Sequence, residues 1–320
     1  MLRTILIYLS KSKWARQFLT QWRFTWRAVS RFVAGERPQD AINAIRELNA
    51  KGIVATLDHL GENVTNAEEA YRSADDIIHI LSLVNQEGVR SGVSIKLSQI
   101  GLALGEEICE PNLRRILSQA KEINSFVRID MEDSPYTEAT LKLFHQMQCS
   151  GFADDVGIVI QAYLYRSEED VRKLVDAGAK VRLCKGAYKE SSKIAFPKKS
   201  EVDENFDLLT SILIDGAMER GSPEISKDGI TPPIPAIATH DEDRIAFAKL
   251  YAEQVRLTNE ALEFQMLYGI RRRLQRQLAE EGYPVRVYVP YGTEWYPYFM
   301  RRLAERPANL WFLLSNLFKR

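Results

Sequence analysis

The sequence predicts an α/β protein built as a (βα)8 barrel of the TIM type. Short runs rich in β-branched residues recur along the 320 residues, and each is followed by a longer stretch with helical spacing. Eight such runs with their helices occupy about 270 residues, close to the roughly 250 typical of this barrel. An open, doubly wound sheet is the alternative. The segment after the first run, LDHLGEN, lacks the G-x-G-x-x-G turn of the dinucleotide-binding members of that class.

The predicted strands are short apolar runs bounded by polar or turn residues. They are 53–57, 92–97, 127–131, 156–161, 180–184, 234–238, 261–267 and 285–289. Helix starts are predicted from Thr65 with Glu68 ahead of 66–88, from Ser134-Pro135, and from Ser200 with Asp203. The glycines and prolines of 185–202 and 222–233 predict long loops after the fifth strand and before the sixth.

The two ends of the chain differ from its middle in charge. Residues 1–35 carry seven bases and no acid, and residues 301–320 carry five bases against one acid, so the middle holds 31 bases and 42 acids. We divide the chain into a helical N-terminal arm (1–45), the barrel (46–306) and a C-terminal amphipathic helix (307–320). Trp14, Trp22 and Trp26 alternate with bases in the arm, which suits an anionic membrane surface and packing across the barrel equally.

Composition excludes several classes of protein. A content of 45% hydrophobic and 27% charged residues excludes wholesale disorder, and 43 bases against 43 acids give no general electrostatic case for nucleic acid. Three widely spaced cysteines form neither a disulfide framework nor a C-x-x-C metal pair, so a cytoplasmic compartment is expected. No run approaches the 18 apolar residues of a membrane span.

Polar residues end nearly every predicted strand, where TIM barrels place their reactive groups. They are Asp58, His59, Lys96, Asp130, Gln161, Arg182, Lys185, Thr239, His240 and Tyr288. Each alone has a structural explanation, such as an Arg182–Asp130 ion pair in the core or a bond from Gln161 to loop backbone. Because unpaired buried charges are costly, their joint density predicts a polar site at this mouth of the barrel.

A cluster of arginines predicts an anion site on the last barrel helix. Tyr298-x-x-Arg301-Arg302-x-x-Glu305 places four side chains at spacings of three and four residues, where helical neighbours interact. Two guanidinium groups can hold one small carboxylate, although an isolated Arg-Arg pair usually belongs to a solvated face.

The segment VRLCKGAY (181–188) is a strand that runs into a glycine turn. Lys185 beside Gly186 supplies a positive charge and a close backbone approach, which suits a phosphate or a flavin dinucleotide. Thr239 and His240 after the sixth strand can bind a pyrophosphate in the same way, although each is also an ordinary loop residue.

Eight segments resemble, in order, the signature of proline dehydrogenase in its short bacterial monofunctional form. They are SIKLS (94–98), RID (128–130), IQAY (160–163), RLCKGAY (182–188), ATH (238–240), EFQML (263–267), YVPYGT (288–293) and YFMRRLAE (298–305). The match runs along 53–305, and the combination of RL-x-KGAY with Y-x-x-RR-x-x-E is specific.

This resemblance implies a distorted (βα)8 barrel that holds FAD non-covalently at its mouth. It implies oxidation of L-proline to Δ1-pyrroline-5-carboxylate by hydride transfer to flavin N5, the first step of proline catabolism to glutamate. Electrons would pass to a membrane quinone, which favours a peripheral position on the cytoplasmic face of the membrane. A separate pyrroline-5-carboxylate dehydrogenase would act downstream.

The resemblance also assigns residues by position. Arg301 and Arg302 would bind the proline carboxylate with help from Lys96, and Glu305 would brace the arginines. The walls around the proline ring would be Ala187, Tyr188, Leu267, Tyr288 and Tyr298. Cofactor contacts would come from Asp130, Gln161, Arg182 near flavin N5, Lys185, Gly186, Ala187, Thr239, His240 and Leu267. The catalytic set would be Lys96, Asp130, Arg182, Tyr288 and Tyr298, with no metal.

Three other functions fit parts of the sequence. A Schiff-base aldolase could use Lys96 or Lys185 as nucleophile. A metal hydrolase could use Asp58, His59 and His240, although the chain has only four histidines and no H-x-H motif. A membrane-surface scaffold with an inactive barrel would need only the basic ends.

Overall fold

The structure is a computed structural model that describes residue 26 and residues 29–61, 64–188 and 190–305, with side chains up to Leu303. Most of the predicted arm and the predicted C-terminal helix (307–320) lie outside these residues. Within the described ranges, no helix is long and apolar enough to cross a lipid bilayer.

Eight parallel strands close into a barrel in chain order, with β8 pairing back to β1. The strands are β1 (Val54–His59), β2 (Ser91–Ile95), β3 (Val127–Ile129), β4 (Val156–Gln161), β5 (Lys180–Cys184), β6 (Pro235–Ala238), β7 (Glu263–Leu267) and β8 (Val285–Tyr291). All eight predicted strands are confirmed, with ends shifted by a few residues. Lys96 and Asp130 therefore follow β2 and β3, and Tyr288 lies inside β8.

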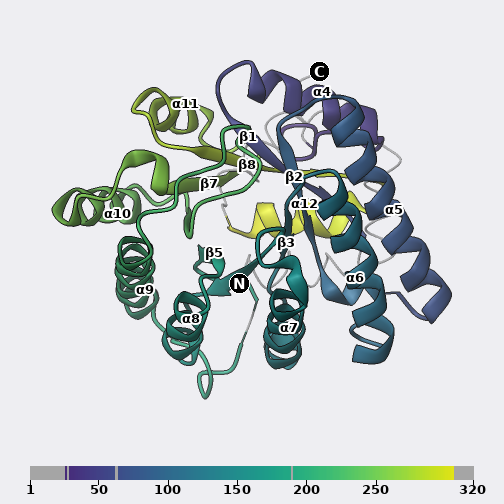
Figure 1. Cartoon of the computed structure of the whole chain (residues 1–320), viewed down its shortest axis with the longest axis horizontal. Helices are drawn as coiled ribbons and strands as arrows, with labels where there is room; N and C mark the ends of the chain where they lie inside the picture. The colour runs from purple at the N-terminus through teal and green to yellow at the C-terminus, as the bar shows by residue number, and fades with distance from the viewer. Residues whose placement is uncertain (1–25, 27–28, 62–63, 189, 306–320) are drawn as a thin grey trace, which may run out of the picture.

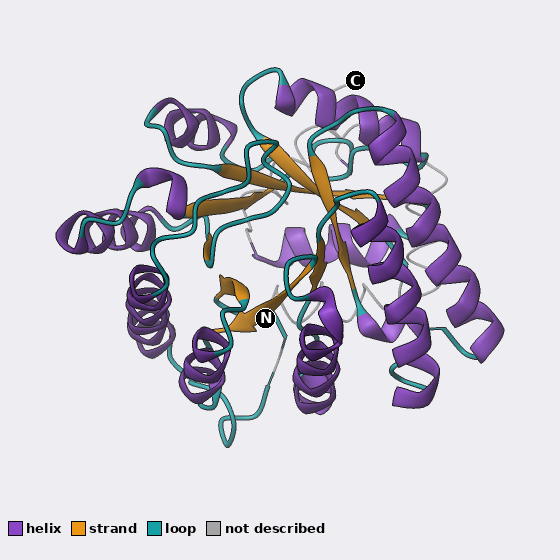
Figure 2. Ribbon diagram, viewed as in Figure 1, coloured by secondary structure: helices purple, strands orange, loops and turns teal. Residues whose placement is uncertain are grey.

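Helices surround the strands as a ring (Figures 1 and 2). They are α4 (Pro38–Asn49), α5 (Ala67–Gln86), α6 (Glu106–Glu122), α7 (Ser134–Met147), α8 (Ser167–Asp176), α9 (Lys199–Glu219), α10 (Glu242–Val255), α11 (Arg272–Glu280) and α12 (Trp295–Glu305). Short helical turns are η1 (Leu97–Ile100), η2 (Gln148–Phe152) and η3 (Asn259–Ala261). The yellow α12 crosses the middle of the view in Figure 1, whereas α4 to α11 lie around the rim.

The predicted start of α5 is displaced by one residue. Asn66 is the N-cap, and its side chain accepts a hydrogen bond from the backbone N of Glu69 at 2.9 Å. Thr65 instead donates to the Glu69 carboxylate from its backbone N at 2.7 Å and from its hydroxyl at 2.9 Å. The predicted Thr65–Glu68 box is therefore wrong, because the neighbouring asparagine takes the capping position.

Two other helix starts also differ. The helix α7 begins at Ser134 with Asp133 as its N-cap, so the predicted proline lies one position further inside. The helix α9 has Lys198 as N-cap, and the backbone N of Lys198 donates to the Glu201 carboxylate at 3.1 Å. The predicted cap at Ser200 is wrong because the helix begins two residues earlier. The carboxylate of Glu201, rather than that of Asp203, accepts from the backbone amide of the N-cap residue.

Apolar side chains fill the layer between the strands and the outer helices. Phe144 of α7, Phe206 of α9 and Leu113 of α6 are completely buried in this layer, which forms one continuous cluster. The helix α4 belongs to it through Ala41, Ile42 and Ile45. The predicted boundary of the arm at residue 45 therefore falls inside a helix that packs on the barrel.

Charged side chains fill the space inside the barrel instead. Arg128, Arg182, Glu263 and Arg286 are buried within the strands, where TIM barrels usually place branched aliphatic residues. Their hydrogen bonds go to other groups of the barrel, either on the next strand, as from Arg286 to Glu263, or one strand further, as from Arg182 on β5 to Gln265 on β7.

A second apolar cluster joins the end of the arm to α12. Phe32 and Val33 pack with Phe299, and the rings of Trp26 and Trp295 meet edge to face at 6.0 Å. The approach is close. A Cβ on Gly269, which has φ +76°, would lie 1.5 Å from the backbone carbonyl oxygen of Arg31. The last part of the predicted arm therefore packs on the barrel, whereas Trp14 and Trp22 lie outside the described residues.

Candidate active site

A cavity of about 810 Å³ opens at the carboxyl ends of the strands. All eight strands or the residues directly after them contribute to its wall, together with α12. The predicted site residues that line it are Lys96, Asp130, Gln161, Arg182, Lys185, Gly186, Ala187, Tyr188, Thr239, His240, Leu267, Tyr288, Tyr298, Arg301 and Arg302. The side chain of Glu305 lies beyond the described part of the chain.

The floor of the cavity is built around Asp130. Its carboxylate accepts from Arg182 Nη1 at 2.7 Å and from the Tyr288 hydroxyl at 2.8 Å, and Arg182 lies 5.5 Å above the centre of the Tyr288 ring. Burial raises the pKa of Asp130, and the positive charges of Arg182 and Lys96 oppose that rise. Burial also raises the pKa of Tyr288 well above its ordinary value, so this hydroxyl stays a hydrogen-bond donor. The expected Arg182–Asp130 ion pair is present, and it lines the cavity.

Lys96 lies beside this floor with its ammonium directed to Asp58. The Nζ–Oδ1 and Nζ–Oδ2 distances are 3.1 and 3.3 Å, and both side chains are almost completely buried. The Lys96 amine is thus engaged by Asp58, whereas a Schiff-base lysine must direct its amine at a carbonyl carbon. The geometry therefore disfavours Lys96 as the nucleophile of an aldolase.

A second part of the cavity, after β5 and β6, carries a cluster of cations and carboxylates. Lys185 forms ion pairs with Asp203 and, at 2.6 Å, with Asp241. Burial raises the pKa of both carboxyls, but hydrogen bonds from lysines outweigh it and hold each pKa below its ordinary value. Lys185 is therefore also engaged by carboxylates. Beside it, the Thr239 hydroxyl accepts from the Asp241 backbone N at 3.1 Å.

Gly186 and Gln161 also line this part of the cavity, the first through its backbone and the second through its side-chain amide. Gly186 has φ +103°, and a Cβ there would lie 2.2 Å from the Tyr163 ring, so the turn of the KGAY motif requires glycine. Gln161 donates from Nε2 to the Met131 carbonyl at 3.4 Å, as expected for a bond to loop backbone. Its Oε1 is buried and has no hydrogen-bond partner among the described residues. An acceptor in the wall of a cavity is thus available for a ligand N–H.

The wall opposite the floor comes from α12. The Arg302 guanidinium lies 5.1 Å above the centre of the Tyr298 ring, which confirms that these residues meet at helical spacing. Leu267 and Tyr288 pack against the cluster that contains Tyr298. Arg301, Arg302 and these apolar walls suit a small ring that carries a carboxylate.

Sequence reasoning missed several residues of the cavity. Gln265, Met131 and Cys184 line it, as do Asp241 and Arg271. Gln265 lies two positions before Leu267 on β7, so the period of a strand was sufficient to find it. Burial raises the pKa of the Cys184 thiol to about 11, so it stays protonated and unreactive.

The residues proposed for a metal hydrolase do not form a ligand set, although Asp58 and His240 both line the cavity. Asp58 is paired with Lys96, and the His59 ring is stacked on Tyr291 at 5.1 Å outside the cavity wall. His240 uses Nε2 to accept from the Leu267 backbone N at 3.0 Å. Among the described residues, no group of three His, Cys, Asp or Glu side chains could hold a metal ion.

The barrel and its cavity define a (βα)8 enzyme with an arginine-lined pocket at the carboxyl ends of its strands. Residues 41–314 match the model of the family described as proline dehydrogenase. The chain belongs to the proline dehydrogenase family, and the resemblance in its motifs is confirmed.

Relatives agree with this assignment over the full length. Proline dehydrogenase 1 of Bacillus subtilis is 41% identical over 320 residues, which cover 100% of both chains. The proline dehydrogenase of Deinococcus radiodurans is 40% identical over 92% of this chain and 91% of its own. Among solved structures, proline utilization A (PutA) from Bdellovibrio bacteriovorus, inactivated by N-propargylglycine, superposes with a TM-score of 0.77 at 26% identity. The match covers 87% of this chain and 32% of the PutA chain.

Proposed function

We propose that this proline dehydrogenase oxidises L-proline to Δ1-pyrroline-5-carboxylate with FAD as the hydride acceptor. The observation that carries the proposal is a single cavity lined both by the arginines of α12 and by the residues assigned to the flavin. Substrate and cofactor can then lie in contact, as hydride transfer requires.

The residues of the cavity fit FAD. Its volume of about 810 Å³ lies within the range of about 300–1,000 Å³ found for ligand pockets. The free Oε1 of Gln161 suits an N–H of the isoalloxazine, and Lys185 with Arg271 and Thr239 suits the pyrophosphate. When bound, FAD supplies N5 as the acceptor of the hydride.

The protein's own part is to orient proline and exclude water. Arg301 and Arg302 bind the carboxylate, and Leu267, Tyr288 and Tyr298 enclose the ring. Arg182 adds a positive charge at the floor, which favours the more anionic reduced flavin. Asp130 holds Arg182 in place through the 2.7 Å bond.

Visible absorption tests the proposal directly. Purified protein is expected to show flavin bands that bleach when L-proline is added without oxygen. A colourless protein that stays inert after FAD is supplied would overturn it. Borohydride trapping with a carbonyl substrate would then test the aldolase alternative.

The arginine clamp has its own test. Because each charge-assisted hydrogen bond contributes about 1.5–3 kcal/mol, Arg302→Met should raise KM for proline by about 10- to 150-fold while FAD stays bound. Arg273→Met, an exposed arginine of α11, is the matched control. Unchanged proline kinetics in variants of both Arg301 and Arg302 would remove the clamp.

We also infer that a membrane quinone reoxidises the flavin at the cytoplasmic face. The seven bases of residues 1–35 and the interleaved tryptophans support binding to an anionic surface. Co-sedimentation with anionic liposomes at low salt is the test, and no sedimentation would contradict the surface association. The product would pass to a separate pyrroline-5-carboxylate dehydrogenase.

A further inference from the structure

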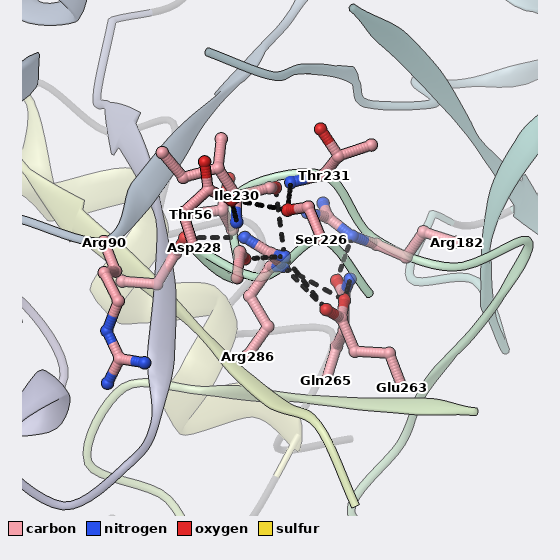
Figure 3. A network of polar contacts seen from close by, with 12 residues as sticks. Thr56, Arg90, Arg182, Ser226, Asp228, Ile230, Thr231, Glu263, Gln265 and Arg286 are labelled. Carbon is pink, nitrogen blue, oxygen red and sulfur yellow. Dashed lines mark hydrogen bonds and ion pairs between the residues drawn. The ribbon is translucent and has the colours of Figure 1, made fainter. Parts of the chain in front are cut away.

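A chain of buried polar side chains leads from the amino-terminal ends of the strands to the cavity (Figure 3). This end of the barrel, opposite the cavity, is called the closed end. At the closed end, Glu263 of β7 forms an ion pair with Arg286 of β8 at 2.9 Å, and the two side chains are 0% and 3% exposed. Arg286 also donates to the carbonyls of Gly229 at 2.8 Å and Ile230 at 3.2 Å. A further bond of 3.1 Å goes to the Ala55 carbonyl. These contacts fix the guanidinium, and so fix the carboxylate that it holds.

The loop that receives Arg286 is braced by its own side chains. Asp228 Oδ1 accepts from the Ser226 hydroxyl and from the Ile230 backbone N at 2.9 Å. The Thr231 backbone N donates to the Ser226 hydroxyl at 2.9 Å. Figure 3 shows these residues gathered around the end of the Arg286 side chain. The closed end of the barrel is therefore an ordered platform for the ion pair.

The next link is the side-chain amide of Gln265. Its Nε2 donates to Glu263 Oε1, and its Oε1 accepts from Nε of Arg182. A flipped amide would place its carbonyl against the Glu263 carboxylate and its NH2 against the Arg182 N–H, so both bonds would be lost. The Glu263 carboxylate and the Arg182 N–H therefore fix the same orientation of the amide, and Glu263 holds its NH2 end in place.

Three hydrogen-bond acceptors orient the guanidinium of Arg182. Gln265 accepts from Nε, Asp130 from Nη1 at 2.7 Å, and Ser94 from Nη2 at 3.1 Å. Asp130 also accepts from Tyr288, which lines the cavity. Each edge of the guanidinium is thus held, and the Gln265 edge depends on Glu263.

We propose that Glu263 is a positioning residue for proline oxidation, which acts through Gln265 to orient Arg182 at the cavity floor. This inference rests on the proposed function. Glu263 does not line the cavity, and its bonded path to Arg182 runs through Gln265. If it served structure alone, its loss would change stability and leave the flavin unaltered.

The test compares Glu263→Gln, Gln265→Met and the double variant. We expect each single variant to lower the rate of anaerobic flavin reduction at saturating proline by about tenfold, with KM changed less than about threefold. Each should also shift the flavin midpoint potential. Because Glu263 acts through Gln265, most of the Glu263→Gln effect should vanish in the Gln265→Met background. Equal effects of Glu263→Gln in both backgrounds would overturn the relay.

Asp170→Asn is the matched control. Asp170 is also a buried carboxylate that holds an arginine twice, since Arg166 donates to it at 2.7 and 2.9 Å, but it lies on the outer helix α8. It should lower the melting temperature without changing the flavin. If Glu263→Gln behaves in the same way, its role is structural and the inference fails.

The outcomes separate the inference from the function on which it rests. A wild-type protein that does not bleach with proline contradicts the proposed function and removes the inference with it. A wild type that bleaches beside unaltered variants contradicts the inference alone. If Glu263→Gln does not fold, Glu263→Asp decides, because it keeps a carboxylate for Arg286 and shortens the side chain that reaches Gln265. It should then slow flavin reduction as Gln265→Met does, and an unaltered rate would overturn the inference.

Discussion

The two sides of the barrel wall are made of opposite kinds of side chain. Outward-facing residues and the helices share an apolar layer, in which Phe144 and Phe206 are completely buried. Inward-facing residues such as Arg128, Glu263 and Arg286 are charged and equally buried. The apolar layer supplies stability through transfer from water, whereas the inner polar network contributes little net stability and sets direction. The two regions should therefore respond differently to substitution.

The largest effect on stability is expected in the apolar layer. Phe144→Ala should lower the free energy of unfolding by about 3–5 kcal/mol, because it removes a large buried ring and leaves a cavity. The midpoint potential of the flavin and KM for proline should not change in the folded protein. Urea denaturation measures the free energy of unfolding, spectroelectrochemistry the midpoint potential, and steady-state kinetics KM. A shifted potential would show that the two regions are coupled.

Substitutions in the inner network should change activity more than stability. Asp130→Asn removes the charge that holds Arg182 and leaves one oxygen for two donors, since Tyr288 also donates to it. We expect kcat to fall about 100-fold, which corresponds to roughly 2.7 kcal/mol in the activation barrier. Steady-state kinetics with proline and an artificial acceptor measures it. Full activity would show that Arg182 keeps its direction without Asp130.

The smallest expected effect concerns Asp207 of α9, which pairs with Arg244 of the neighbouring helix α10, away from both regions. Burial raises its pKa from 3.8 to about 6, and Arg244, 3.0 Å away, opposes this rise. Between pH 4 and 6 the folded state binds more protons at this site than the unfolded state, so stability falls as pH rises through this window. Asp207→Asn should remove that decline from melting curves recorded across the same range. An unchanged pH profile would assign it to other groups.

The fold was predictable because its signal is local. Each strand is a short apolar run that a helix follows, and the strand ends bring Lys96, Asp130 and Lys185 to one mouth whatever the details of packing. The inner charges had a signal too, since Glu263, Gln265 and Leu267 alternate along β7. Glu263 and Gln265 lie four and two positions before the end of β7, so a search restricted to strand ends does not find them.

Partners across the barrel could not be predicted in this way. The bond from Arg182 to Gln265 joins β5 to β7 over 83 positions, and it depends on the stagger of the strands. The loop at the closed end is similar, because nothing in its sequence indicates that its carbonyls receive Arg286. Helix caps also failed by a residue or two, since neighbouring polar side chains compete for the same amide.

The cysteines, which the chemistry does not use, make the protein convenient to observe. Burial raises the pKa of both Cys109 and Cys184, so these thiols resist alkylation. Cys149 is exposed on η2, which precedes β4 and so lies at the end of the barrel away from the cavity. A maleimide dye should therefore attach at one position of the unaltered chain, and it could report binding to vesicles by fluorescence without a tag or a substitution.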